Sequence, residues 1–174
     1  MKRSTTKLAA ILLAFQLPAA AFAISLSASA TLIRGDGTTV GQAMLTPKDG
    51  GLWLEVEASG LTPGAHGIHL HAVGTCTAPD FASAGGHWNP MQHKHGTEAA
   101  DGPHMGDLPN LVADDAGKAH LAALVSMATL DGSEMGVFDA DGTAIVIHAG
   151  PDDYKTDPSG NSGARVACGV VRAN

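Results

Sequence analysis

The sequence predicts an all-β protein, a Greek-key antiparallel β-sandwich or flattened barrel of about eight strands with two long functional loops. Short segments in which apolar and polar residues alternate recur along the chain, as expected for strands with one buried face. Turn-forming pairs separate these segments. No long segment has a convincing helical period, which leaves the strand pattern as the main signal.

Seven segments carry this pattern. In chain order they are 25–33, 40–46, 51–59, 66–72, 119–126, 143–149 and 165–172. The turn Asp36-Gly37 follows the first segment, Asp49-Gly50 separates the second from the third, and Thr62-Pro63-Gly64 precedes the fourth. Asp131-Gly132 and Asp141-Gly142 lie between the fifth and the sixth. The sixth is also rich in β-branched residues, which is typical of a buried strand.

Two stretches do not follow this rhythm of strands and turns. Residues 74–106 consist largely of Gly, Pro, His and Asp, and residues 150–163 form a shorter stretch of similar composition. Loops of this length are uncommon in compact domains and usually carry function. We therefore expect the functional site in or beside these loops.

The N-terminus predicts a secretory signal peptide over residues 1–23. Lys2, Arg3 and Lys7 form a charged region, an apolar run follows, and Ala21-Phe22-Ala23 fits a cleavage site. We expect cleavage near Ala23, a single mature domain over residues 24–174, a periplasmic or secreted location and no stable membrane association. Cleavage after residue 30 and retention as an uncleaved anchor are the alternatives.

Charge limits the classes of partner. The mature chain keeps seven Lys and Arg residues against 17 Asp and Glu, so its net charge becomes −10. A nucleic-acid partner is not expected for such an acidic chain. An anionic substrate is repelled by most of its surface unless a local positive group overrides that field.

The two cysteines predict one structural disulfide. Cys76 and Cys168 lie 92 positions apart in a chain that is expected to be exported, where disulfides form and persist. Thiolate metal ligands are the alternative, although histidines are plentiful and the cysteines lack a C-x-x-C spacing.

Nine histidines lie between His66 and His148. In the motif G-I-H-L-H, His69 and His71 share one strand face and can chelate one metal ion, whereas His66 has the opposite parity and is expected to pack or form hydrogen bonds. The long loop adds His87, His95 and His104 with Asp107, a set that can close a tetrahedral site.

His148 ends the buried sixth segment. By itself it is better interpreted as a core histidine with both ring nitrogens satisfied. Together with His69, His71 and His87 it becomes the fourth ligand of an all-imidazole site, which suits copper.

The motifs taken together resemble a known family. G-I-H-L-H, S-A-G-G-H-W-N-P, H-M-G-D-L-P-N, I-V-I-H-A-G-P-D-D and G-N-S-G-A-R-V-A-C-G-V occur in the order found in the copper-zinc superoxide dismutases of secreted bacterial type. The resemblance covers essentially the whole mature chain. It implies copper and zinc as cofactors, superoxide as substrate and a possible homodimer.

The resemblance also implies roles for single residues. The copper ligands are His69, His71, His87 and His148, and the zinc ligands are His87, His95, His104 and Asp107. His87 then bridges both metals, which requires a deprotonated imidazole. Asp152 matches an aspartate that links one ligand of each metal by hydrogen bonds.

Arg165 matches the arginine of the active site in this family. Its guanidinium supplies the local positive group that an anionic substrate needs on this acidic chain, because a cation beside copper attracts and orients the superoxide anion. The family mechanism implies two alternating one-electron steps at copper, with His87 releasing copper and taking up a proton on reduction. Zinc has no redox chemistry and is expected to fix the loop.

Other functions remain to be distinguished. A non-catalytic protein for copper storage or delivery on the same scaffold is the main alternative, and a zinc hydrolase with an open site is a weaker one. His93 and His120 match no ligand of the family and are assigned to the surface, although His93 lies close enough to His95 to replace it in the zinc set. Lys155 is a candidate for steering the substrate. Met127 and Met135 are interpreted as packing residues rather than copper ligands.

Overall fold

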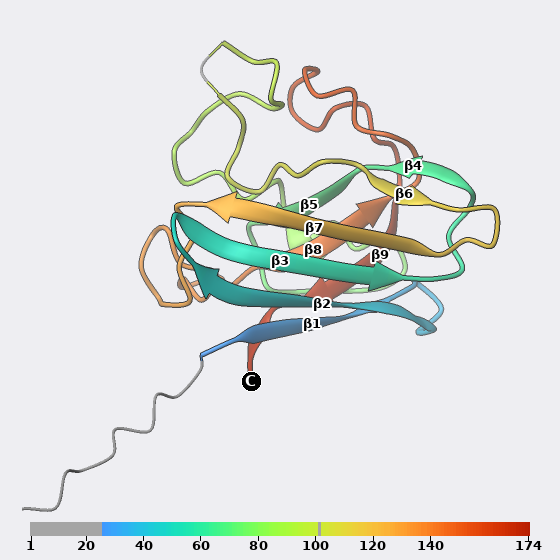
Figure 1. The fold of residues 1–174 in the computed structure, drawn as a ribbon, viewed down its shortest axis with the longest axis horizontal. Coiled ribbons are helices and arrows are strands. Elements are labelled where there is room, and N and C mark those ends of the chain that lie inside the picture. The colour runs from blue at the N-terminus through green and yellow to red at the C-terminus, as the bar shows by residue number, and fades with distance from the viewer. Residues whose placement is uncertain (1–25, 101) are drawn as a thin grey trace, which may run out of the picture.

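The computed structural model describes residues 26–100 and 102–174, which form an antiparallel sheet of ten strands (Figure 1). The elements are β1 (Ala28–Ile33), β2 (Thr39–Lys48), β3 (Gly51–Ala58), β4 (Gly64–His66), β5 (Ile68–His71), η1 (Ala82–Ala84), β6 (Leu111–Ala113), β7 (Ala119–Ser126), β8 (Ala144–His148), β9 (Arg165–Val170) and β10 (Arg172–Ala173). The short 3₁₀ helix η1 is the only helical element within these residues. The all-β fold class is therefore confirmed.

The sheet curls until its two ends nearly meet. Its strand order is β4-β6-β7-β3-β2-β1-β9-β8-β5, and β10 pairs with β1. The two end strands, β4 and β5, are consecutive in the chain, with only Gly67 between them. A Cβ atom at Gly67 would lie 2.6 Å from Ser162 Oγ, so this position requires the smallest residue. The result is a flattened, nearly closed barrel.

The core lies inside this barrel. In β7 every second residue is buried, and β3 buries Leu52, Leu54 and Val56 in the same manner. Full burial of each leucine stabilises the fold by about 1.5–3 kcal/mol. The alternation in the sequence thus arises because one face of each of these strands packs inward and the other faces solvent.

Strand β8 is buried on both faces. Ile145 and Ile147 face the main core, while Ala144 and Val146 pack with Phe81 and other residues in a second apolar cluster. Residues of the first long loop cover this cluster, and the disulfide between Cys76 and Cys168 ties that loop to β9. The expected disulfide is therefore present.

The structure adds strands that the sequence analysis did not predict. The fourth expected segment begins in β4, breaks at Gly67 and continues in β5. Strands β6 and β10 were missed because they contain only three and two residues. Such short runs cannot display a period of two. The predicted signal peptide over residues 1–23 lies outside the described residues. No helix within them is long and apolar enough to cross a membrane.

The two methionines behave differently. Met135 is half-buried and packs against the main core, as expected. Met127 is 48% exposed, so its interpretation as a packing residue is wrong. It follows directly after β7, where a left-handed backbone conformation begins the next turn.

Candidate metal centre

The later part of the first long loop and the second long loop lie on the same side of the barrel (Figure 1). Figure 1 shows them as the yellow-green and orange-red loops at the top of the view. They are joined directly, because the backbone N–H of His95 in the first loop donates to Asp157 Oδ1 in the second at 2.9 Å. The predicted ligands meet under this pair of loops.

Four histidines converge in the first group: His69, His71, His87 and His148. Their ligand atoms all lie within 4.8 Å of one another. Strand β5 supplies the first two on one face, and β8 supplies His148 from the neighbouring position in the sheet. His87 enters from the first loop, where it pairs with His71 in an isolated bridge.

The free nitrogens of this group show that it fits a metal ion. His69 Nδ1, His71 Nε2, His87 Nε2 and His148 Nε2 are buried and have no hydrogen-bond partner among the described residues. Buried polar atoms are nearly always satisfied, so four orphaned nitrogens at one point need a common partner. A cation that accepts four imidazole lone pairs satisfies all of them.

The second group consists of His87, His95, His104 and Asp107. His87 Nδ1 lies 2.8 Å from Asp107 Oδ1, and His104 Nδ1 lies 3.3 Å from the same oxygen. His95 Nδ1 is 3.1 Å from Asp107 Oδ2. Three imidazoles and one carboxylate, all nearly buried, form the donor set of a closed tetrahedral site.

His87 belongs to both groups. Its Nε2 points toward the four histidines, and its Nδ1 points toward Asp107. The ring of His87 stacks on that of His69, with 3.9 Å between their centroids. One side chain therefore presents a donor to each of two adjacent sites.

Asp152 connects the two groups through a hydrogen bond to one histidine of each. Its Oδ2 accepts from His69 Nε2 at 2.7 Å, and its Oδ1 accepts from His95 Nε2 at 2.9 Å. These bonds leave Nδ1 of both rings free for a metal ion. Asn110 holds Asp152 in place through two hydrogen bonds to its backbone, at 2.8 and 2.9 Å.

Burial and neighbouring carboxylates shift the pKa values of the histidines in opposite directions. Burial lowers the pKa of His71 to about 2, and it lowers the pKa of His87 and of His148 to about 4. Burial also acts to lower the pKa of His95, but the carboxylates of Asp107 and Asp152 outweigh it and raise that pKa to about 9. His71, His87 and His148 are thus neutral and ready to donate lone pairs at pH 7.

Arg165 lies at the edge of the four-histidine group. Its backbone pairs with that of His148, and its guanidinium donates from Nη1 to Phe81 O and from Nη2 to Gly85 O, both at 2.6 Å. Gly85 O also accepts from His71 Nδ1 at 2.9 Å. Arg165 shares the lining of a cavity with His71, His87 and His148. A fixed positive charge therefore faces the same space as the open nitrogens.

Comparison with known proteins identifies the family. A family model described as copper/zinc superoxide dismutase (SODC) matches residues 39–171. The chain belongs to this family.

Relatives of the superoxide dismutase family match over most of the chain. Copper-zinc superoxide dismutase 2 of Aquifex aeolicus is 44% identical and covers 99% of this chain and 100% of its own length. The crystal structure of a superoxide dismutase-like protein from Bacillus subtilis is 41% identical with a TM-score of 0.78, and covers 82% of this chain and 96% of that one. The enzyme from Brucella abortus is 31% identical with a TM-score of 0.65, and covers 84% and 99%.

Several residues of this dismutase-family chain take no part in either donor set. His66 is buried, with its ring nitrogens 2.7 Å from His148 O and 2.8 Å from Thr62 O, so it forms hydrogen bonds as its strand parity indicates. Lys155 lies on the surface and pairs with Glu98 at 3.8 Å. His93 stays outside the second group, which His95 completes.

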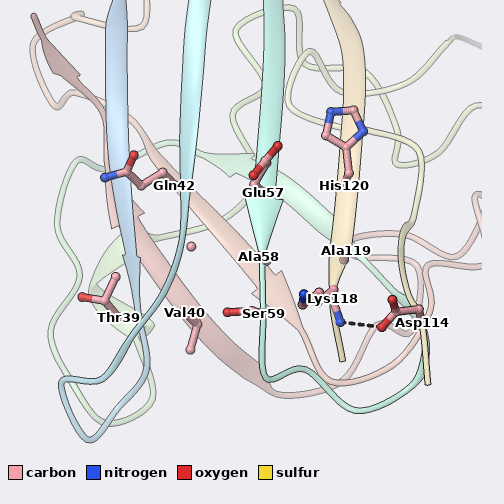
Figure 2. Close-up of a pocket in the computed structure, with 11 residues that line it drawn as sticks. Thr39, Val40, Gln42, Glu57, Ala58, Ser59, Asp114, Lys118, Ala119 and His120 are labelled. Atoms are coloured by element: carbon pink, nitrogen blue, oxygen red, sulfur yellow. Dashed lines mark hydrogen bonds between the residues drawn. The ribbon is translucent and has the colours of Figure 1, made fainter. Parts of the chain in front are cut away.

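His120 is exposed on the outer face of β7. It lines a shallow groove with Glu57 and Gln42 from the neighbouring strands (Figure 2). This groove shares no residue with the cavity beside the histidine groups. His120 is therefore a surface residue, as the sequence analysis expects.

Two features of the superoxide dismutase site were not predicted from the sequence. They are the carbonyl of Gly85, which His71 and Arg165 share, and the contact of Asn110 with Asp152. A backbone carbonyl has no residue-specific signal in the sequence. Asn110 ends the motif H-M-G-D-L-P-N, which is the one signal that could have indicated it.

Proposed function

We propose that this chain is a superoxide dismutase, which converts two superoxide anions and two protons to dioxygen and hydrogen peroxide. The observation that carries the proposal is the sharing of His87 by two complete donor sets, with the guanidinium of Arg165 facing the cavity beside the four-histidine set. Family membership agrees with this activity, because superoxide is the substrate of the family.

The chemistry of the donors assigns the metals. His69, His71, His87 and His148 offer only imidazole nitrogens, which suit copper. His87, His95, His104 and Asp107 offer three imidazoles and a carboxylate, which suit zinc in a closed structural site. Copper, when bound, supplies a one-electron couple, whereas zinc has no redox chemistry.

Arg165 binds and orients the substrate. The chain has a net charge of −7, so most of its surface repels an anion. The guanidinium is held by Phe81 O and Gly85 O, which leaves it fixed rather than mobile at the cavity. A fixed cation there attracts superoxide locally and needs no rearrangement when the anion arrives.

His87 is the residue that can hold a proton for the product. Its Nδ1, 2.8 Å from Asp107 Oδ1, is the donor that it offers to the second set, so a proton taken up by the ring goes to Nε2. That atom faces the four-histidine group and the side chain lines the cavity. A proton held at Nε2 is therefore within the space where peroxide forms.

Asp152 acts through other residues. Its carboxylate fixes the ring orientation of His69 and His95, one ligand from each set, and it makes no contact with the substrate space in this arrangement. The two sites are thus oriented by a single side chain.

We further propose that the protein works outside the cytoplasm. Residues 1–23 have the features of a signal peptide, and the disulfide between Cys76 and Cys168 fits an oxidising compartment. A periplasmic or secreted protein without stable membrane association is consistent with this proposal.

A non-catalytic copper-binding protein is the second candidate. One relative with 41% identity is named superoxide dismutase-like rather than superoxide dismutase, so the fold alone does not establish the activity. The complete four-histidine set and Arg165 favour the enzyme here, because storage of copper does not require a cation beside the metal.

Metal content and superoxide dismutation, measured on the purified mature chain with and without copper reconstitution, test the proposal. We expect one copper and one zinc per chain and activity that depends on copper. Two bound metals without activity would support the copper-binding protein. Uptake of zinc alone would show that the four histidines do not form a copper site.

A further inference from the structure

The cavity beside the donor sets offers a route for metal ions. His71, His87 and His148 line it from the four-histidine set, and His104 lines it from the second set. The remaining ligands are enclosed, since His69 and His95 are 0% exposed. A hydrated ion that enters here has to lose its water before it reaches buried nitrogens, and this desolvation is costly unless protein donors replace the water stepwise.

His93 lines the same cavity and belongs to neither donor set. Its Nδ1 lies 3.2 Å from Pro103 O, and because a carbonyl only accepts, Nδ1 is the donor in this bond and Nε2 is the nitrogen that the neutral ring offers as a ligand. Asn89 fixes its backbone with two hydrogen bonds, from His93 N to Asn89 Oδ1 at 3.0 Å and from Asn89 Nδ2 to His93 O at 2.8 Å. His93 is therefore an oriented imidazole with an available donor atom.

Asp157 supplies a carboxylate to the lining of this cavity from the other loop. Its side chain is 56% exposed, and its Oδ1 lies 4.0 Å from His104 Nε2. The same oxygen accepts the backbone N–H of His95 at 2.9 Å. This carboxylate thus reaches from solvent to the edge of the second donor set.

We propose that His93 and Asp157 form an entry site, which captures a divalent ion of the zinc type at the cavity and passes it to the buried ligands. An imidazole and a carboxylate are donors that such an ion accepts, and the carboxylate attracts the cation. Each donor replaces water while the ion moves from solvent to His104 and the enclosed histidines. The inference rests on the donor sets of the proposed function, and it gives His93 a role that those sets leave open.

The test compares uptake rates of Co²⁺, a coloured probe for zinc sites, by the metal-free full-length mature chain in stopped flow. His93→Asn removes the Nε2 donor, while the asparagine amide can still donate to Pro103 O in place of Nδ1. We expect uptake to slow several-fold, with the final Co²⁺ content and the melting temperature unchanged. His120→Asn is the matched control, because it makes the same change on the distant outer face of β7, and its uptake rate should equal that of the wild type.

Asp157→Asn provides a second measurement should His93→Asn fail to fold, and it should also slow uptake several-fold. Unchanged uptake rates in these variants would overturn the entry site. A loss of final Co²⁺ content in His93→Asn would also overturn it, because His93 would then be a ligand of the final site. A wild-type chain that binds no Co²⁺ at all would instead overturn the donor sets of the proposed function.

Discussion

His148 and Arg165 lie opposite each other across the ladder between β8 and β9, where a bulge interrupts the register after Ile147. The guanidinium of Arg165 also shares the carbonyl of Gly85 with His71. The positive charge is therefore attached to the four-histidine group both through the sheet and through the first loop. Its position depends on the fold of the barrel more than on the flexibility of a long side chain.

Replacement of Arg165 by alanine should lower the rate constant for superoxide by about tenfold or more and flatten its dependence on ionic strength. Both metals should stay bound, because the guanidinium contacts no ligand atom of either set. Stopped-flow rates at several salt concentrations and metal analysis check this. Arg172→Ala removes the same charge from an exposed strand and should change the rate little. Metal loss in Arg165→Ala would mean that the residue maintains the site's structure.

Replacement of His95 by alanine should remove zinc selectively. His95 belongs to the second set only and is fully enclosed, so its loss leaves three donors for zinc and all four donors for copper. Metal analysis after equilibration with both ions measures this outcome. His93→Ala serves as the control and should retain its zinc, and zinc content that is normal in His95→Ala would contradict the assignment.

Replacement of Asp152 by asparagine should weaken the binding of both metals by about 10–100-fold. The carboxylate is the acceptor for His69 and for His95, and an amide cannot accept equally from both rings. Competition with a chelator gives the affinities. Asp153→Asn alters the adjacent carboxylate, which has no histidine partner, and its metal affinities should match those of the wild type. An effect on one metal alone would show that Asp152 does not orient both sites.

Reduction of the bond between Cys76 and Cys168 should lower the melting temperature. The bond closes a loop over 92 positions, and the chain-entropy estimate for such a loop is at most about 4–5 kcal/mol. Thermal unfolding of the oxidised and reduced chains, both with metals loaded, measures the difference. The double variant with both cysteines replaced by alanine should be insensitive to reductant, and identical melting curves for the oxidised and reduced wild type would contradict a stabilising role.

The metal-free protein should be most stable near pH 6.5. The pKa values of His71, His87 and His148 are lowered to about 2, 4 and 4 in the folded chain, so the unfolded chain binds more protons below pH 6.5 and stability falls toward pH 4. The pKa of His95 is raised to about 9, so its contribution is complete below pH 6.5 and is lost as pH rises to 9.

Thermal unfolding of the metal-free chain between pH 4 and 9, in the presence of a chelator, checks this profile. A melting temperature that does not fall between pH 6.5 and pH 4 would contradict the burial of three neutral histidines. The His95→Ala variant should lose the decline on the alkaline side and keep the decline on the acidic side.

The sequence by itself determined the fold class, the bounds of β7 and the disulfide. Alternation of apolar and polar residues is a local property, so a strand as long as residues 119–126 is visible without any knowledge of its partners. A chain with two cysteines has only one possible internal pair. The sequence also indicated which histidines belong together, through the order of motifs that resemble those of one family.

The family resemblance favoured His95 over His93, but only the tertiary structure shows that His95 lies in the second donor group, where its ring also donates to Asp152 from the second loop. The tertiary structure also shows that His71 and Arg165 share the carbonyl of Gly85, and that the fourth segment divides at Gly67. Each depends on contacts between residues far apart in the chain. These contacts form when the barrel closes and its two end strands, β4 and β5, come close together. No local pattern of residue types predicts them.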